Sequence, residues 1–223
     1  MSLFSALRGG NITEILILLF VKLFTVFCIL PVHEFAHAWM ATRLGDNTAR
    51  LSGRLTLNPM AHLTLPGIIM VVLFGFGYAK PVPVNIRNFQ NRKRDFALTA
   101  IAGPVSNLLM AVIYGLLANL FKHFYTGSNI VYIAYLFMYY AVMINVSLAV
   151  FNLLPVPPLD GSRLATVIFP DRIYYKIMQY ERYIMIGLFV LLFMGILDVP
   201  LTFLSNYVMK FIMWLTGLPF KFF

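Results

Sequence analysis

Charged residues, and acidic ones above all, are scarce in this chain. Charged residues make up 11% of its 223 residues, and only eight are Asp or Glu, whereas soluble domains contain about 25% charged residues. There is a single cysteine, Cys28, so no internal disulfide can form. Apolar residues make up 61% of the sequence, and the mean hydropathy is +0.83. These values exclude a water-soluble domain and predict a polytopic membrane protein.

Basic residues outnumber acidic ones and give a formal net charge of +9. An excess of this sign can indicate nucleic-acid binding. Here, however, Lys and Arg lie mostly in loops beside apolar runs, where basic residues set the orientation of a membrane protein. We therefore expect a lipid bilayer around this chain and no nucleic acid among its partners.

Apolar runs of about 20 residues can cross a bilayer as helices. The candidate runs lie at about 12–40, 97–121, 129–154, 183–197 and 200–216. They predict an all-α polytopic membrane protein with about five to six transmembrane helices. In so short a chain they leave little room for a soluble domain, so we expect one membrane-embedded domain over residues 1–223.

A further apolar stretch, residues 62–79, is interrupted by Pro66, Gly67, Gly75 and Gly77. A full crossing would separate the basic loops at 43–54 and 80–94, whereas the positive-inside rule favours both in the cytoplasm. A re-entrant element, partly β, satisfies the rule. Irregular backbone at membrane depth is tolerated only against protein or a water-filled cavity, so re-entry predicts a cavity here. Whether the stretch crosses or re-enters stays open.

The same rule orients the rest of the chain. It predicts an N-terminus outside the cell, an outward run at 97–121 and an inward return at 129–154. His37, at the end of the first run, and the stretch after Leu154 then both reach the cytoplasmic third of the bilayer. They can meet there.

The first apolar run contains the stretch His33-Glu34-Phe35-Ala36-His37. Two His four residues apart share one face of a helix, and with the neighbouring Glu they form a zinc-hydrolase motif. Ionisable groups at membrane depth cost about 2.5–3.5 kcal/mol each, which makes a functional role the default interpretation. The stretch therefore predicts a catalytic metal site within a spanning helix.

A catalytic zinc needs a third protein ligand, and Asp160 is the best candidate for it. It follows three prolines that end the preceding helix and extend the backbone, so its carboxylate can turn inward. The other Asp residues look like loop charges or lie on the opposite side of the membrane: Asp46, Asp95, Asp171 and Asp198. A lone loop residue, His62, is more typical of a hydrogen-bonded group than of a ligand.

Glu34 lies about 100° round the helix from His33, so it does not share the ligand face. It can instead take a proton from a zinc-bound water that attacks a carbonyl, which predicts amide hydrolysis. Two neutral polar residues in apolar helices, Asn107 and Asn152, are candidates to stabilise the developing oxyanion. They could equally hold helices together by hydrogen bonds.

Three motifs in this order resemble the site-2 protease family of intramembrane zinc metalloproteases (peptidase family M50). They are His33 to His37, the run from Gly103 to Asn107, and the run from Asn152 to Gly161. The stretch from Gly75 to Asn85 is similar to the short bacterial branch that lacks PDZ and CBS domains. The resemblance covers about residues 12–165, the expected catalytic core, and leaves a C-terminal helical pair at about 183–216.

This resemblance implies one zinc ion per chain, held by His33, His37 and Asp160. It implies that Glu34 is the base and that Asn107 and Asn152 lie near the scissile peptide. It also implies that Gly75, Phe76 and Gly77 form an edge strand that holds an unwound substrate.

Single-span membrane proteins or peptides are the expected substrates, in regulated intramembrane proteolysis or in clearance of membrane remnants. A regulatory partner could control their access. The expected location is the bacterial inner membrane, with the active site toward the cytoplasm. Two alternatives are a membrane metal transporter, in which Glu34 would be replaceable, and an inactive relative that binds membrane segments without cutting them.

Overall fold

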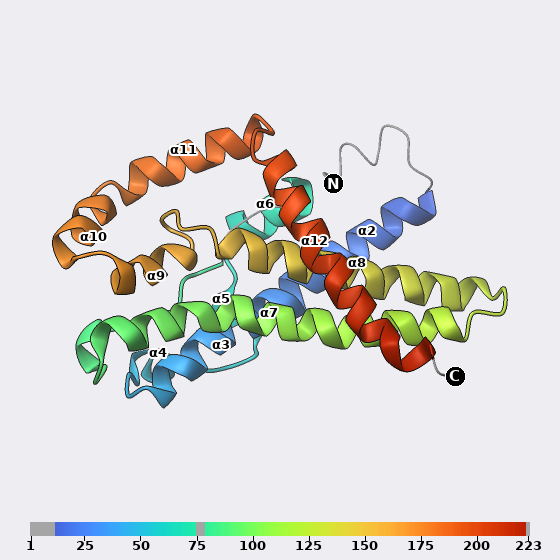
Figure 1. The fold of residues 1–223 in the computed structure, drawn as a ribbon, viewed down its shortest axis with the longest axis horizontal. Helices are drawn as coiled ribbons and strands as arrows, with labels where there is room; N and C mark the ends of the chain where they lie inside the picture. Colours follow the sequence, from blue (N-terminus) through green and yellow to red (C-terminus); the bar gives the residue numbers. More distant parts are fainter. Residues whose placement is uncertain (1–11, 75–78, 222–223) are drawn as a thin grey trace.

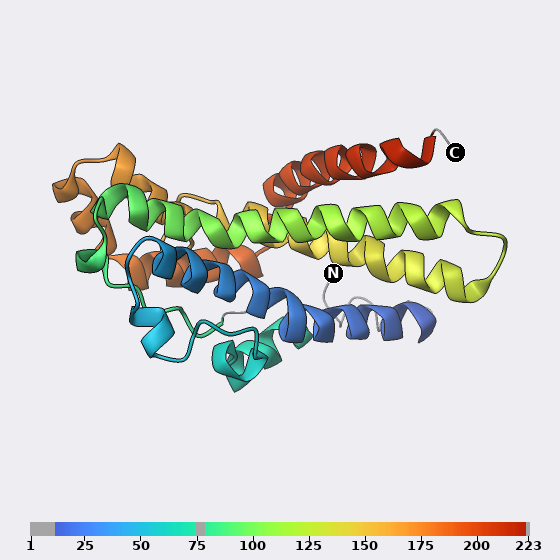
Figure 2. The same ribbon diagram turned by 90° about the horizontal axis from the view of Figure 1, so that it is seen from below.

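The computed structural model describes residues 12–74 and 79–221, and within these ranges the chain is helical and contains no β-strand. The long helices run roughly along one axis of the molecule (Figures 1 and 2). This arrangement confirms the predicted all-α class. Residues 75–78, which include Gly75, Phe76 and Gly77 of the predicted edge strand, lie outside the described residues.

The first apolar run forms one helix with a widened turn in its middle. It consists of α2 (Ile12–Phe24), a π-helical turn η1 (Thr25–Ile29) and α3 (Leu30–Arg43). In the π turn the backbone N–H of Leu30 bonds to the carbonyl of Thr25, five residues earlier. Pro31 follows at once, and because proline lacks an N–H and crowds the preceding turn, a widened turn accommodates it without breaking the helix. The prediction of a helix at 12–40 is correct, but the π turn within this helix was not predicted.

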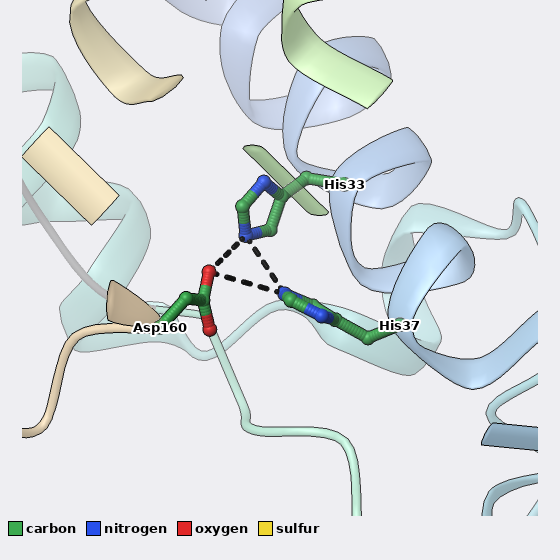
Figure 3. Close-up of side chains that lie close together, drawn as sticks. All are labelled: His33, His37 and Asp160. Carbon is green, nitrogen blue, oxygen red and sulfur yellow. Dashed lines mark hydrogen bonds and ion pairs between the residues drawn. The ribbon is translucent and has the colours of Figure 1, made fainter. Parts of the chain in front are cut away.

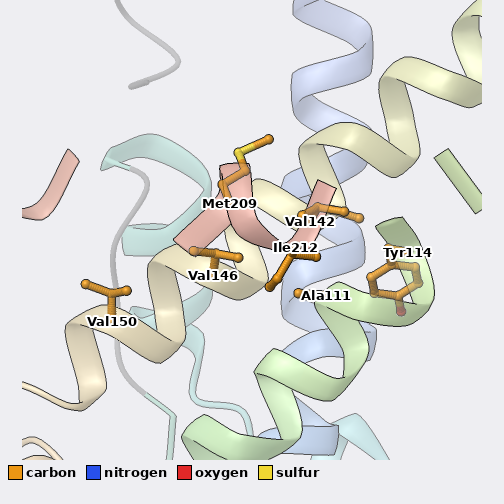
Figure 4. Close-up of a cluster of buried hydrophobic side chains, with 8 residues drawn as sticks. Ala111, Tyr114, Val142, Val146, Val150, Met209 and Ile212 are labelled. Atoms are coloured by element: carbon orange, nitrogen blue, oxygen red, sulfur yellow. The ribbon is translucent and has the colours of Figure 1, made fainter. Parts of the chain in front are cut away.

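The centre of the molecule is an antiparallel hairpin of α7 (Arg92–His123) and α8 (Asn129–Asn152), crossed by α12 (Asp198–Gly217). Small residues such as Ala111 and Ala141 are fully buried between the helices and allow them to approach closely. Figure 4 shows the apolar cluster at this crossing, which contains Val142, Val146 and Ile212. This cluster holds α12 against the hairpin.

The C-terminal pair does not form two separate spans by the criteria of length and hydropathy. Helix α11 (Glu181–Phe193) and helix α12 meet at an angle of 83° and reach those criteria only together. Among the described residues, three helices are long and apolar enough to cross a membrane by themselves: Ile15–Arg43, Arg92–His123 and Asn129–Asn152. The described residues therefore contain three candidate spans, or four if the bent pair is one span, and the predicted five to six are not confirmed.

Between α3 and α7 the chain forms short helices and loops. These are α4 (Thr48–Leu51), α5 (Pro59–His62), α6 (Leu65–Phe74) and the 3-10 turn η2 (Ile86–Asn88). The backbone N–H of Lys80 donates a 2.7 Å hydrogen bond to the carbonyl of His62, so the two ends of the apolar stretch 62–79 meet. A partly β element here is not confirmed.

Two more short helices connect the hairpin to the C-terminal pair. The 3-10 turn η3 (Leu218–Lys221) follows α12. The two connecting helices are α9 (Gly161–Ile168) and α10 (Asp171–Met178). Both lie at the same end of the bundle as the C-terminus of α3 and the N-terminus of α7, as Figures 1 and 2 agree. The α7–α8 turn and the C-terminus lie at the other end.

Candidate metal centre

Three side chains from distant parts of the sequence converge at one point. The Nε2 atoms of His33 and His37 each lie 3.2 Å from Oδ2 of Asp160, and they lie 3.1 Å from each other. Figure 3 shows both imidazole rings, from α3, directed at the carboxylate from the turn before α9. In the described part of the chain this is the one group of three His, Cys, Asp or Glu residues that could hold a metal ion.

The distances within this group fit a zinc ion. In a tetrahedral site with zinc–ligand distances of about 2.0–2.1 Å, neighbouring ligand atoms lie about 3.3 Å apart. The two rings are 5% and 7% exposed, and the carboxylate is partly exposed. Three protein ligands with one more accessible side are the arrangement of a catalytic zinc site, which keeps its fourth position for water or substrate.

A second contact fixes the ring of His37. Its Nδ1 lies 2.8 Å from the backbone carbonyl of Thr99 in α7. Because a carbonyl only accepts, Nδ1 carries the proton and donates it, which leaves the lone pair of Nε2 for a metal. The Thr99 hydroxyl in turn donates to the carbonyl of Asp95, one turn earlier. The sequence offers no signal for this contact, because the acceptor is a backbone atom.

Gly103, also in α7, provides the space that the two rings occupy. A Cβ atom at this position would lie 2.3 Å from Nε2 of His37 and 2.6 Å from Cε1 of His33. Both distances are far below van der Waals contact, so any larger residue would displace the rings. The sequence shows a glycine within this apolar helix, but its role in making space for the two rings was not predicted.

A tight turn presents Asp160. Helix α8 ends at Asn152, and the proline-rich segment that follows leads to Asp160 directly before α9. A Cβ on Gly161 would lie 2.2 Å from the carbonyl oxygen of Leu153, so the turn closes only around a glycine. Burial acts to raise the pKa of Asp160, but His37 and His33 outweigh burial and lower this pKa below its usual range. A carboxylate binds a metal ion in its ionised form.

The other predicted site residues are not joined to the three ligands by hydrogen bonds in the described residues. Glu34 is half-buried and follows His33 on α3. Asn107 is fully buried one turn after Gly103, and neither polar atom of its amide has a hydrogen-bond partner in the described part of the chain. Asn152 is half-buried and donates to the carbonyl of Leu148 at 3.0 Å.

His62 is not part of the metal group. It is buried, and its Nε2 lies 2.8 Å from the carbonyl of Thr56. It is thus a hydrogen-bonded loop residue, as the sequence favoured.

Comparison with known proteins gives a consistent result. The profile of peptidase family M50 matches residues 121–195. The Bacillus subtilis protein named "Putative zinc metalloprotease YwhC" is 40% identical over 161 residues, which cover 71% of this chain and 74% of that protein. The chain belongs to peptidase family M50. As the motifs predicted, this M50 protein is therefore a metalloendopeptidase of the site-2 protease type.

In two other relatives the match covers about half of the relative's own length. The Mycolicibacterium smegmatis protein named "Putative zinc metalloprotease Rip2" is 35% identical over 141 residues, which are 59% of this chain and 51% of that protein. The Methanocaldococcus jannaschii protein named "Putative zinc metalloprotease MJ0611" is 33% identical over 98 residues, covering 44% of this chain and 48% of that protein. No solved structure gives a significant match. The relatives' names imply zinc, and the group formed by His33, His37 and Asp160 fits it.

Proposed function

We propose that this chain is an intramembrane zinc metalloprotease that hydrolyses peptide bonds in or near the transmembrane segments of other membrane proteins. One observation carries the proposal. Two imidazoles from an apolar helix and one carboxylate converge to within 3.1–3.2 Å of one another, in a protein of peptidase family M50. His33, His37 and Asp160 hold a single zinc ion in this proposal.

The chemistry follows from the positions of the side chains. A zinc ion held by His33, His37 and Asp160 would lower the pKa of a water molecule and polarise the substrate carbonyl. Glu34, beside His33 on the same helix, accepts the proton of the attacking water and passes it to the leaving amine. Asn107 is assigned to the region of the scissile peptide from the sequence motif, and its buried amide has no hydrogen-bond partner among the described residues. Asn152 is also proposed to lie near the scissile peptide, on the basis of the sequence motif alone.

The substrate has to unwind before it can be cut. Peptide bonds in a spanning helix are shielded by their own hydrogen bonds and by lipid. An exposed strand edge offers replacement hydrogen bonds to an extended peptide, and Gly75, Phe76 and Gly77 are proposed to form that edge. The support for this role of the three residues comes from the sequence. The ends of this stretch are held together by the bond between Lys80 and His62, which favours a re-entrant element over a full crossing.

The membrane arrangement is proposed on the distribution of charge. Basic residues gather at the end of the bundle that carries the C-terminus of α3, the N-terminus of α7, and helices α9 and α10. The positive-inside rule then assigns this end, and the metal site near it, to the cytoplasmic side of a bacterial cell membrane, with the N-terminus outside. The whole chain, 1–223, is proposed to be one membrane-embedded domain with a catalytic core at about 12–165 and a C-terminal pair at about 183–216.

The decisive experiment compares the intact chain with Glu34→Gln on a single-span model substrate in liposomes, with bound zinc measured in both. The matched control is Asp198→Asn, which makes the same change from carboxylate to amide at an exposed position. We expect cleavage by the intact chain and the control but not by Glu34→Gln, with equal zinc in all three. Equal cleavage by Glu34→Gln would remove the base from the mechanism. Zinc binding without any cleavage would instead favour a transporter or an inactive relative.

A further inference from the structure

A groove outside the metal centre lies where α10 meets α11. Its volume is about 550 Å³, and it is open on one side. It is lined by Arg172, Ile173, Lys176, Ile177, Tyr180 and Ile184. Arg172 and Lys176 lie one turn apart on α10, as do Ile173 and Ile177, and Tyr180 and Ile184 continue the lining beyond the end of α10.

The groove combines two cations with an apolar wall. Arg172 and Lys176 are exposed, lie one helical turn apart, and form no ion pair with any described side chain. The carboxylate of Glu181 at the start of α11 faces another cation, Arg163, at 3.6 Å. Two cations one turn apart, with no ion pair to a described side chain, attract a single anion, and a guanidinium and an ammonium are both good phosphate donors.

The apolar residues extend away from the cations. Ile173 and Ile177 repeat the one-turn spacing, and both are partly exposed, at 47% and 37%. Tyr180 continues the wall, with an apolar ring and a polar tip that suit the boundary between lipid and water. A soluble anion gains nothing from this wall, whereas a lipid does.

The position of the groove in the molecule supports the same occupant. Helix α10 lies at the end of the bundle where the basic residues gather. In a multi-pass membrane protein such an end faces the leaflet surface that carries anionic headgroups, and each nearby Lys or Arg strengthens the attraction.

We propose that the groove between α10 and α11 binds an anionic glycerophospholipid. The phosphodiester lies between Arg172 and Lys176, and an acyl chain follows Ile173, Ile177 and Ile184. Recognition depends on the negative headgroup and on the hydrocarbon together.

One chain of contacts links this groove to the metal centre. On α10, the Tyr174 hydroxyl lies 3.4 Å from Nη1 of Arg163, which lies three residues after Asp160. The same guanidinium lies 5.5 Å above the ring of Phe96 in α7 and forms an ion pair with Glu181 of α11 at 3.6 Å. A lipid that holds α10 therefore also steadies α9 and the turn that presents Asp160. This effect on cleavage rests on the proposed function, but the binding itself does not.

The test measures lipid binding directly. The full chain in detergent is titrated with dioleoylphosphatidylglycerol, or with the zwitterionic dioleoylphosphatidylcholine, and bound lipid is resolved by native mass spectrometry. The variants are Arg172→Gln/Lys176→Gln and a matched control, Arg50→Gln/Arg87→Gln, which removes two exposed cations from the same end of the bundle. Equal thermal unfolding midpoints confirm that both fold.

We expect the intact chain to prefer the anionic lipid, the groove variant to bind it at least about tenfold more weakly, and the control to match the intact chain. Ile177→Asn, which keeps both cations, should also weaken binding. Equal affinity for the two lipids would overturn the proposal, and so would equal losses in the groove variant and the control, which would indicate diffuse attraction. Displacement of the lipid by millimolar inorganic phosphate would show a simple anion site and would also overturn it.

Discussion

The guanidinium of Arg54 lies 3.2 Å from the carbonyl oxygen of Pro81, although 27 residues separate them. The same buried side chain, 6% exposed, also donates to the carbonyls of Ala61 and Lys80. A guanidinium carries five donors and can serve several carbonyls at once. Together with the hydrogen bond from Lys80 to His62, Arg54 holds the two ends of the apolar stretch 62–79 side by side.

Substitution of Arg54 should loosen the contact between the two ends of the stretch 62–79 without changing the metal ligands. Arg54→Met keeps the apolar stem but leaves buried carbonyls without donors, so we expect a loss of about 1–3 kcal/mol in the free energy of unfolding. We also expect slower cleavage with unchanged zinc content. Arg54→Lys keeps the positive charge but has fewer donors, so its stability and cleavage rate should lie between those of Arg54→Met and the intact chain. The matched control is the exposed Arg50→Met on α4, and denaturant titrations with cleavage assays provide the measurement. If Arg54→Met matched that control in both, Arg54 would have no clamping role.

Gly103 gives a second prediction, on metal affinity. Gly103→Ala places a methyl group 2.3 Å from Nε2 of His37, so the ring has to move. We expect zinc affinity to fall by about 10–100-fold, the range seen when the surroundings of a metal ligand are disturbed. The control is Gly187→Ala on α11, where an added Cβ meets nothing within 4 Å. Zinc titration with a competing chelator measures both variants, and equal affinities would contradict the close packing.

The sequence predicted those features that depend on long runs and on local spacing. The helices at 97–121 and 129–154 were found because apolar length alone defines a spanning helix. The first range lies a few residues inside α7, and the second begins with α8 and ends two residues beyond it. His33 and His37 are four residues apart, so a helix places them on the same face. Asp160 could be singled out as a partner for them because prolines release the chain from its helix there, and the structure brings all three together.

Other features depend on tertiary packing and were not predicted. The contact of His37 with Thr99 uses a backbone carbonyl, which any residue provides. The space at Gly103 is defined only by the partner helix. The bend between α11 and α12 lies at a short break that contains Gly195, whose φ is +71°. Composition could not distinguish one broken span from two complete ones.

Asp46 gives a prediction that depends on pH. It is fully buried and accepts hydrogen bonds from Thr48, Asn85 and Asn88, which attach the loop before α7 to the end of α3. Burial acts to raise the pKa of Asp46, but these donors outweigh burial and lower it. A lowered folded-state pKa stabilises the fold above the unfolded value of about 3.9, and this stability is lost as the pH falls.

We therefore expect Asp46→Asn to be less stable than the intact chain at neutral pH, and the difference to shrink as the pH falls below about 4. Unfolding midpoints in detergent, measured across this range, provide the test. Asp198→Asn, at an exposed position, should show no such convergence. A difference between Asp46→Asn and the intact chain that stayed constant with pH would mean that the ionised carboxylate is not what holds the loop.

The buried amide of Asn107 allows stability and catalysis to be separated. Neither of its polar atoms has a hydrogen-bond partner in the described residues, and an unsatisfied buried polar group costs about 1–3 kcal/mol. Asn107→Leu, of similar shape, should therefore raise the unfolding midpoint or leave it unchanged. If Asn107 contacts the scissile peptide as proposed, the same variant should cleave far more slowly while it keeps its zinc.

Asn145 on α8 is the matched control for this variant. It is equally buried, and its Oδ1 also lacks a partner in the described residues, although its Nδ2 donates to the carbonyl of Ala141. Asn145→Leu should change stability in a similar direction but retain cleavage, because no proposed step uses it. Full cleavage by Asn107→Leu would assign Asn107 to helix packing alone. Equal losses in both variants would show that cleavage depends on the packing of α7 against α8 and not on a contact between Asn107 and the substrate.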